Sequence, residues 1–222
     1  MARVVVPDVA HHVTQRGNRR GDVFFSDADK RHLLGLLGEY PQDCGLEILA
    51  CCLVTNHVHL AAVPERENSL ARTLKPVNLR YAQYVNRVQG WCGRLRQERF
   101  FSCPMDAGHT LMAVRCVEQN PVRAGLASRA EECYLSSAAG HTGRRVDPLV
   151  SDRLDLLSVV GNWAEWLTED EDADRLARLR MHTRTGRPLG ADTFVSQMEQ
   201  LTHRELRPRP RGRPHRHGGN AQ

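Results

Sequence analysis

Two apolar blocks lie close together in the N-terminal half of the chain, over 46–54 and 60–63, with a short polar stretch between them. Short apolar blocks bounded by turn residues are typical of buried strands. We therefore expect one strand over 46–54 and a second that begins near His57. A first strand is expected between residues 4 and 17, where apolar and polar residues alternate, and a further strand between residues 94 and 102.

Helical spacing of apolar residues separates these strands. Leucines at helical intervals predict a helix that is capped by Ser26 or Asp27. The same periodicity predicts helices over 69–88 and over 106–119. The last of these helices should end before Pro121, because the residue before a proline disfavours helical dihedral angles.

The expected order of strand, helix, strand, strand, helix and strand indicates an α/β (α+β) fold, a ferredoxin-like sandwich with an antiparallel sheet. We assign this domain to residues 1–135. A helical, arginine-rich C-terminal extension is expected over 136–204, with helices over 154–167 and 175–180. Residues 205–222 form a basic Arg/Pro-rich tail that we expect to be disordered when alone.

The composition limits the partners and the cellular compartment that we expect for the protein. The formal net charge of +5 is a mild basic excess, consistent with a nucleic-acid partner. The seven cysteines form no Cys-x-x-Cys pair, which argues against a structural zinc site and favours reduced thiols in a cytoplasm. No apolar run approaches the length that spans a membrane, so we expect no membrane partner.

The strongest chemical signal is the sequence His57-Val58-His59 at the start of the third expected strand. Side chains alternate along a strand, so His57 and His59 project from one face, roughly 6.6 Å apart along the backbone. Two imidazoles at that spacing can converge on one divalent ion. The alternative is a pair of partly buried histidines with no ligand.

Four motifs occur in order along the chain and are read together. They are His12-Val13-Thr14-Gln15-Arg16-Gly17-Asn18-Arg19-Arg20, Asn56-His57-Val58-His59-Leu60, Arg99-Phe100-Phe101-Ser102-Cys103-Pro104 and Asn120-Pro121-Val122-Arg123-Ala124-Gly125-Leu126. Together they resemble the REP-associated tyrosine transposases, which belong to the insertion-sequence-200-like group of HUH transposases. The resemblance runs over about 11–126 and resumes over 183–190.

The resemblance implies a bacterial, nucleoid-associated protein that cleaves and transfers single-stranded DNA beside short palindromic (REP-like) hairpins. It implies a divalent cofactor, Mg²⁺ or Mn²⁺, bound by His57 and His59 with help from Asn120. It also implies that a tyrosine hydroxyl attacks the scissile phosphate and forms a 5′-phosphotyrosine bond. Related transposases include monomers and homodimers, so the oligomeric state is left open.

The chain departs from the family at the nucleophile. In the family, the tyrosine stands four residues before the asparagine of the Asn-Pro motif, and here that position is Cys116. One interpretation is an impaired copy that still binds metal and hairpin DNA. In a second, Tyr81 or Tyr84 supplies the attack, and in a third Cys116 itself attacks. Arg96 is a lesser departure, at a position where relatives usually carry tryptophan.

Two other function classes compete with a transposase. One is a catalytically inactive, domesticated hairpin-DNA-binding protein, which would bind with a steep salt dependence and without nicking. The other is an unrelated metal hydrolase in which the histidine pair is coincidental; it would turn over a small phosphoester and ignore hairpins.

Basic and aromatic residues around these motifs are candidate DNA contacts, because arginine binds phosphate and aromatic rings stack on bases. The alternatives are a solvated basic turn after the first strand, an ordinary edge strand near residue 100, and a nonspecific tether in the tail. The candidates are Arg16, Arg19, Arg20, Arg94, Arg99, Phe100, Phe101, Arg123, Arg211 and Arg213.

Overall fold

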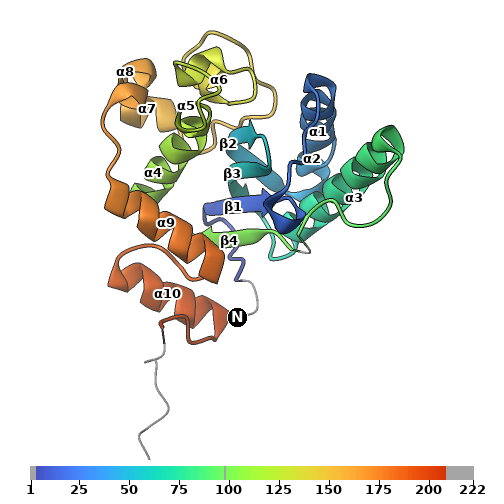
Figure 1. The fold of residues 1–222 in the computed structure, drawn as a ribbon. Coiled ribbons are helices and arrows are strands. Elements are labelled where there is room, and N and C mark those ends of the chain that lie inside the picture. Colours follow the sequence, from blue (N-terminus) through green and yellow to red (C-terminus); the bar gives the residue numbers. More distant parts are fainter. Residues whose placement is uncertain (1–3, 98, 209–222) are drawn as a thin grey trace, which may run out of the picture.

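The computed structural model describes residues 4–97 and 99–208. Its strands are β1 (His11–Arg16), β2 (Leu46–Val54), β3 (His57–Pro64) and β4 (Phe101–Pro104). They form one sheet in the order β2-β3-β1-β4, in which all neighbouring strands are antiparallel (Figure 1). The arrangement confirms the expected α/β fold with an antiparallel, ferredoxin-like sheet.

Helices connect the strands and follow the last one. They are α1 (Asp27–Glu39), α2 (Pro41–Cys44), α3 (Ser69–Gln89), α4 (Ala107–Glu118), α5 (Asn120–Arg123), α6 (Ala138–His141), α7 (Leu156–Val160), α8 (Trp163–Thr168), α9 (Ala173–Thr185), α10 (Asp192–Thr202) and the 3-10 turns η1 (Asn18–Arg20) and η2 (Ala130–Glu132). The start of α1 is a capping box: the Ser26 hydroxyl accepts the Asp29 N–H, and the Asp29 carboxylate accepts the Ser26 N–H. Within the described residues, no helix is long and apolar enough to cross a membrane.

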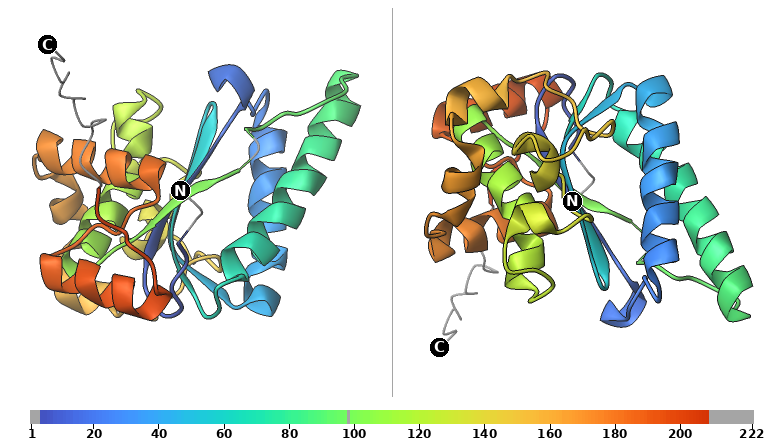
Figure 2. Two further views of the ribbon diagram at one scale, coloured as in Figure 1. Left: turned by 90° about the horizontal axis from the view of Figure 1, so that it is seen from below. Right: turned by 90° about the horizontal axis from the view of Figure 1, so that it is seen from above.

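Helices cover both faces of the sheet (Figure 2). On one face, α1 and α3 pack on a core that includes Val13 and Leu60. On the other face, α4 and α9 pack on a core that includes Ala61 and Cys103. Because both faces are covered, β2 and β3 are buried almost throughout and lack the alternation of a half-exposed strand.

The fourth strand begins later than the expected range of 94–102. The backbone before it is used elsewhere, because Gln97 donates its N–H to the carbonyl of Arg16 at 3.0 Å and Asn18 donates its N–H to the carbonyl of Leu95 at 3.0 Å. Segment 95–97 therefore pairs with the end of β1 and with the loop that follows β1. The strand that pairs fully with β1 starts only at Phe101.

Two expected helices are each divided in the structure. The helix over 106–119 ends at Glu118, and Pro121 then lies in the first turn of the separate helix α5, where its missing N–H is not needed. The helix over 154–167 is split into α7 and α8 at Gly161, whose φ of +70° cannot continue an α-helix.

The segment after α5 shares its core with the sheet. Leu179 of α9 and Leu189 are fully buried in the same cluster as Cys103 of β4. The backbone N–H of Leu189 donates to the carbonyl of Pro104 at 2.9 Å, and the N–H of Asp106 donates to the carbonyl of Leu189 at 3.1 Å. Helix α9 is thereby held against the edge strand β4, next to β1.

A buried carboxylate joins α4 to the helices beyond it. Glu118, at the end of α4, is fully buried. One of its oxygens accepts hydrogen bonds from the Ser137 hydroxyl at 2.5 Å and the His141 ring at 2.6 Å. The other accepts the indole N–H of Trp163 at 2.7 Å. Because a buried carboxylate is stable only when its oxygens are satisfied, these three donors fix the position of α4.

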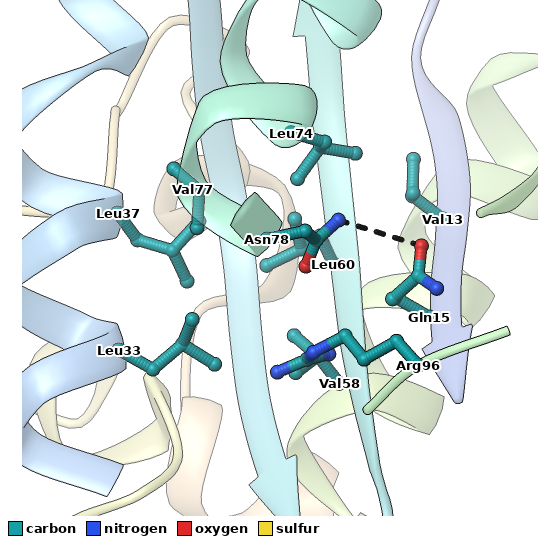
Figure 3. A pocket seen from close by; sticks show the side chains of 10 residues that line it. All are labelled: Val13, Gln15, Leu33, Leu37, Val58, Leu60, Leu74, Val77, Asn78 and Arg96. Atoms are coloured by element: carbon teal, nitrogen blue, oxygen red, sulfur yellow. Dashed lines mark hydrogen bonds between the residues drawn. The ribbon is translucent and has the colours of Figure 1, made fainter. Parts of the chain in front are cut away.

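Arg96 lies in the core between the sheet and the α1–α3 layer (Figure 3). It is 7% exposed, and none of its three guanidinium nitrogens has a hydrogen-bond partner among the described residues. The guanidinium lies over the ring of Tyr81 at 5.1 Å and that of Phe24 at 5.8 Å. A cavity of about 10 Å³ beside it is lined mainly by apolar side chains. Burial lowers the pKa of Arg96 to about 10.

We expect Arg96→Met to stabilise the protein, because it removes a buried charge without an anionic partner and keeps an unbranched chain. The free energy of unfolding in urea should rise by roughly 1–4 kcal/mol. Arg72→Met, at an exposed position of α3, is the control and should change it by less than about 0.5 kcal/mol. A loss of stability in Arg96→Met would mean that the contacts with the two rings outweigh the desolvation of the charge.

Candidate active site

A pocket of about 670 Å³ opens on the face of the sheet that α4 and α9 cover. Strands β1, β3 and β4 and helices α4, α5 and α9 all contribute side chains to it. The lining residues are His12, Thr14, Arg16, Arg20, Val54, Thr55, Asn56, His57, His59, Gln97, Phe101, Cys116, Asn120, Arg123, Ala124, Arg180, Thr183 and Arg184. The pocket thus brings together His57, His59, Cys116 and Asn120.

The two histidines of β3 lie side by side in this pocket, with ring centroids 4.5 Å apart. Nδ1 of His57 is 2.6 Å from Oδ1 of Asn56, and the amide nitrogen of Asn56 donates to the carbonyl of Arg20 at 3.1 Å. Because Oδ1 can only accept, Nδ1 of His57 carries the proton and Nε2 keeps its lone pair. This lone pair is the one that a metal ion would use.

His59 is more deeply buried, at 8% exposure. Its Nδ1 lies 3.2 Å from Nε2 of His12, a third histidine that comes from β1. Its Nε2 is buried and has no hydrogen-bond partner in the described part of the chain. A buried polar atom without a partner is uncommon, and in a pocket it marks a position where a ligand can bind.

All three imidazoles are neutral at pH 7. Burial, followed by the positive charges of Arg16 and Arg180, lowers the pKa of His57 to about 4. Burial is also the largest cause for the other two rings: it lowers the pKa of His12 to about 3 and that of His59 well below its usual value. Neutral rings keep a lone pair, which is the form that coordinates a metal.

Asn120 supplies an oxygen to the same pocket. Its amide nitrogen donates to the carbonyls of Cys116 at 3.0 Å and Val117 at 3.3 Å, so its Oδ1 is the atom left for a ligand. Two imidazole nitrogens and one amide oxygen fit a divalent cation that accepts mixed donors. No cluster of three or more His, Cys, Asp or Glu side chains suited to a metal occurs in the described residues. The amide oxygen of Asn120 would be the third donor beside the two imidazoles.

Cys116 faces the pocket from α4 but is only 3% exposed. Burial raises the pKa of its thiol to about 11, although the nearby charges of Arg123 and Arg180 act in the opposite direction. Nη2 of Arg123 lies 3.4 Å from its Sγ. The thiol is therefore protonated at neutral pH, and a protonated thiol is a poor nucleophile.

The alternative nucleophiles Tyr81 and Tyr84 are both on α3, which packs against the opposite face of the sheet. Tyr81 is fully buried there, and its hydroxyl donates to the carbonyl of Val23 at 2.6 Å. The interpretation in which either tyrosine attacks at the histidine pair is therefore wrong for this structure, since neither ring lines the pocket.

The predicted DNA contacts divide into two groups. Arg16, Arg20, Arg123 and Phe101 line the pocket, and Phe101 is 38% exposed. Phe100 is instead buried in the core of the α1–α3 face, so the expectation that its ring forms a base platform is wrong. Arg19, Arg94 and Arg99 are exposed outside the pocket, whereas Arg211 and Arg213 lie outside the described residues.

Sequence reasoning missed the residues that α9 contributes. Thr183, Arg180 and Arg184 all line the pocket, and Nδ1 of His12 lies 2.7 Å from the hydroxyl of Thr183. A signal existed, because residues 183–190 belong to the segment in which the family resemblance resumes. Arg180 and Arg184 are also four residues apart, so they share a helix face. Nothing local in the sequence indicated which face met the site.

Comparisons with known proteins place the family and the fold. A model of the family described as "Transposase IS200 like" matches residues 5–119. A solved structure of a REP-associated tyrosine transposase bound to a REP hairpin is similar, with a TM-score of 0.55, 16% identity, and coverage of 68% of this chain and 89% of that chain. A putative transposase from Deinococcus radiodurans has a TM-score of 0.37, 18% identity, and coverage of 48% and 86%. No curated protein matches.

Alkylation can test the state of Cys116. We expect iodoacetamide to label the exposed Cys92 rapidly at pH 7.5 and Cys116 slowly, with peptide mass spectrometry as the measurement. The rate for Cys116 should rise about tenfold per pH unit between pH 7 and 9, because its thiol has a pKa of about 11. Equal labelling of both cysteines at pH 7.5 would contradict this and restore Cys116 as a candidate nucleophile.

Proposed function

This chain belongs to the IS200-like transposase family, and from that premise we propose that it binds hairpin-forming single-stranded DNA at the pocket around His57 and His59. We propose that it is an HUH-type DNA nuclease and strand transferase impaired at one step, the nucleophilic attack. The observation that carries the proposal is the state of Cys116. Its side chain lies in the pocket with both histidines and Asn120, yet it is only 3% exposed, and burial raises the pKa of its thiol instead of lowering it as an activated nucleophile requires.

The charge of the pocket supports a DNA ligand. Five arginines line it, Arg16, Arg20, Arg123, Arg180 and Arg184. Arginine side chains bind phosphate through charge-assisted hydrogen bonds, and the release of counterions makes such binding strongly salt-dependent. The exposed ring of Phe101 at the same pocket can stack on an unpaired base. The transposase with a TM-score of 0.55 was solved with a REP hairpin, which makes a hairpin the first ligand to test.

The donor set of the pocket supports a divalent cation. His57 and His59 would bind it through their Nε2 atoms and Asn120 through its Oδ1, and Mg²⁺ or Mn²⁺ is the ion that the family implies. When bound, the cation supplies polarisation of a phosphoryl oxygen and stabilises the charge that develops during phosphoryl transfer. The chain itself keeps both rings neutral by burial and orients His57 through Asn56.

The step that we propose is lost is the nucleophilic attack, because Cys116 of α4 stands at the nucleophile position. In the transposases that this chain resembles, a tyrosine oxygen at this position forms a bond to phosphorus, while the bond from phosphorus to the 3′ oxygen breaks and that oxygen takes up a proton. Position 116 lies one helical turn before Asn120, so its side chain points into the same pocket. A buried, protonated thiol cannot perform this attack efficiently.

A second candidate function is a catalytically inactive, domesticated hairpin-binding protein. The same protonated thiol favours it, because the pocket keeps its basic lining whether or not cleavage occurs. The two candidate functions differ in whether the histidines, Asn120 and the basic pocket can still support DNA cleavage. Restoring a tyrosine at position 116 separates them.

We expect Cys116→Tyr to form a covalent protein–DNA adduct with an end-labelled, single-stranded hairpin oligonucleotide in the presence of Mn²⁺, and the unmodified protein to form none. The pocket of about 670 Å³ has room for the ring. The adduct is measured by denaturing electrophoresis. It should disappear in Cys116→Tyr/His57→Ala, and Cys92→Tyr, a tyrosine added at an exposed cysteine, should not produce it.

Two results would change the proposal. An adduct from the unmodified protein would overturn the loss of the nucleophile, and peptide mapping would identify the attacking residue. No adduct from a folded Cys116→Tyr that still binds the hairpin would favour the inactive binding protein. In both cases, hairpin binding measured between about 50 and 200 mM salt should weaken steeply with salt.

A further inference from the structure

We propose that Thr183 of α9 is a positioning residue that sets the tautomer of His59, acting through His12. This inference rests on the proposed role of His59 as a metal ligand. The three side chains come from α9, β1 and β3, and they form one buried chain of hydrogen bonds that leads into the pocket. Figure 1 shows α9 beside the β1–β4 edge of the sheet, where this chain begins.

The direction of these hydrogen bonds is set at Thr183, the residue farthest from His59 in the series. The Thr183 hydroxyl has a single proton, and its Oγ1 lies 2.8 Å from the carbonyl oxygen of Leu179 one turn earlier in α9. A carbonyl oxygen can only accept, so the hydroxyl donates to it. The lone pairs of Oγ1 then remain for Nδ1 of His12, 2.7 Å away, which must be the protonated nitrogen of that ring. Cys103 Sγ, at 3.4 Å from Oγ1, can donate to it as well.

The same assignment of donors and acceptors applies to the rings of His12 and His59. His12 is 1% exposed, and its two ring nitrogens face a hydroxyl and another imidazole, so burial favours the neutral ring. Because Nδ1 carries its single proton, Nε2 is an acceptor. Nδ1 of His59 lies 3.2 Å from that atom and must therefore donate to it. His59 is then protonated at Nδ1, and its Nε2 keeps a lone pair. That Nε2 is the buried atom without a partner that we place at the cation position.

His57 reaches the same tautomer by a separate route. Its Nδ1 donates to Asn56, whose amide orientation is fixed by the carbonyl of Arg20. The two rings therefore present equivalent lone pairs, one fixed by neighbours in the loops beside β3 and the other by Thr183, 171 positions from His12 in the sequence. Helix α9 thus takes part in the site and does more than cover the sheet.

If these hydrogen bonds ran in the opposite direction, Nε2 of His59 would lose its free lone pair. If Thr183 no longer accepted from Nδ1 of His12, that ring could carry its proton on Nε2 and donate to His59. His59 would then carry its own proton on Nε2, where it would block coordination. Partners that orient a ligating histidine in this way typically change metal affinity by about 10- to 100-fold.

We call the hydrogen-bonded series Thr183, His12 and His59 the relay. Three substitutions test it. Thr183→Val keeps the shape and removes the hydroxyl, whereas Thr183→Ser keeps the hydroxyl. Thr110→Val is the matched control, because Thr110 is equally buried and its hydroxyl donates to the carbonyl of Asp106 at 2.8 Å, one turn earlier in its own helix, without a histidine attached. The tautomers are measured on the metal-free protein by long-range ¹H–¹⁵N NMR of the histidine rings, and Mn²⁺ affinity by calorimetry.

We expect His12 and His59 to be protonated at Nδ1 in the unmodified protein and in Thr110→Val. In Thr183→Val, His59 should shift toward the Nε2-protonated form, and the Kd for Mn²⁺ should rise by about 10- to 100-fold. Thr183→Ser should restore both. A merely structural role for Thr183 would lower stability in both valine variants to a similar extent and leave the ring tautomers unchanged.

Two outcomes overturn the relay: His59 protonated at Nε2 in the unmodified protein, or a tautomer that Thr183→Val leaves unchanged. The proposed function fails separately. If the tautomers respond as expected but the unmodified protein does not bind Mn²⁺, the relay stands and the metal-binding role of His59 is wrong. The NMR measurement needs neither metal nor DNA, so the two results are independent.

Discussion

The pairing of β1 with β3 in the middle of the sheet is the contact on which the site depends. Its register places Thr14 opposite His59 and Arg16 opposite His57, and residues opposed in this way project from the same face. A shift by one residue would turn β3 over and place both histidines in the apolar core under α1 and α3. The two cores, one on each face, exclude that alternative, so packing far from the pocket holds the two histidines on the pocket face.

The features that could be predicted from sequence are those with local signals. The bounds of β2 and the start of β3 follow from two apolar blocks, and the start of α1 follows from a serine followed three residues later by a carboxylate. The pairing of His57 with His59 needs only the alternation of a strand. Asn120 and Cys116 could be placed because one helical turn separates them, although their approach to the histidines came from the family resemblance.

The remaining features depend on contacts between distant segments. Nothing near Thr183 in the sequence indicates that it meets His12, because that contact is made only when α9 docks on β4. Arg180 and Arg184 enter the pocket by the same docking. Phe100 and Phe101 are adjacent and chemically identical, yet one is in the core and the other lines the pocket, because consecutive residues at the start of β4 point to opposite sides of the sheet. Local patterns cannot decide which side is which.

Two buried polar groups without partners lie on opposite faces of the same sheet, and their surroundings give them different meanings. The guanidinium of Arg96 borders a cavity of about 10 Å³ with mainly apolar walls, too small for anything beyond about one water molecule. Nε2 of His59 opens on a pocket of about 670 Å³ that also contains His57, Asn120 and five arginines. Each unpartnered group costs roughly 1–3 kcal/mol or more. The open pocket at His59 has room for a ligand to offset that cost, whereas the cavity at Arg96 does not, which is why we place the proposed site on the histidine face of the sheet.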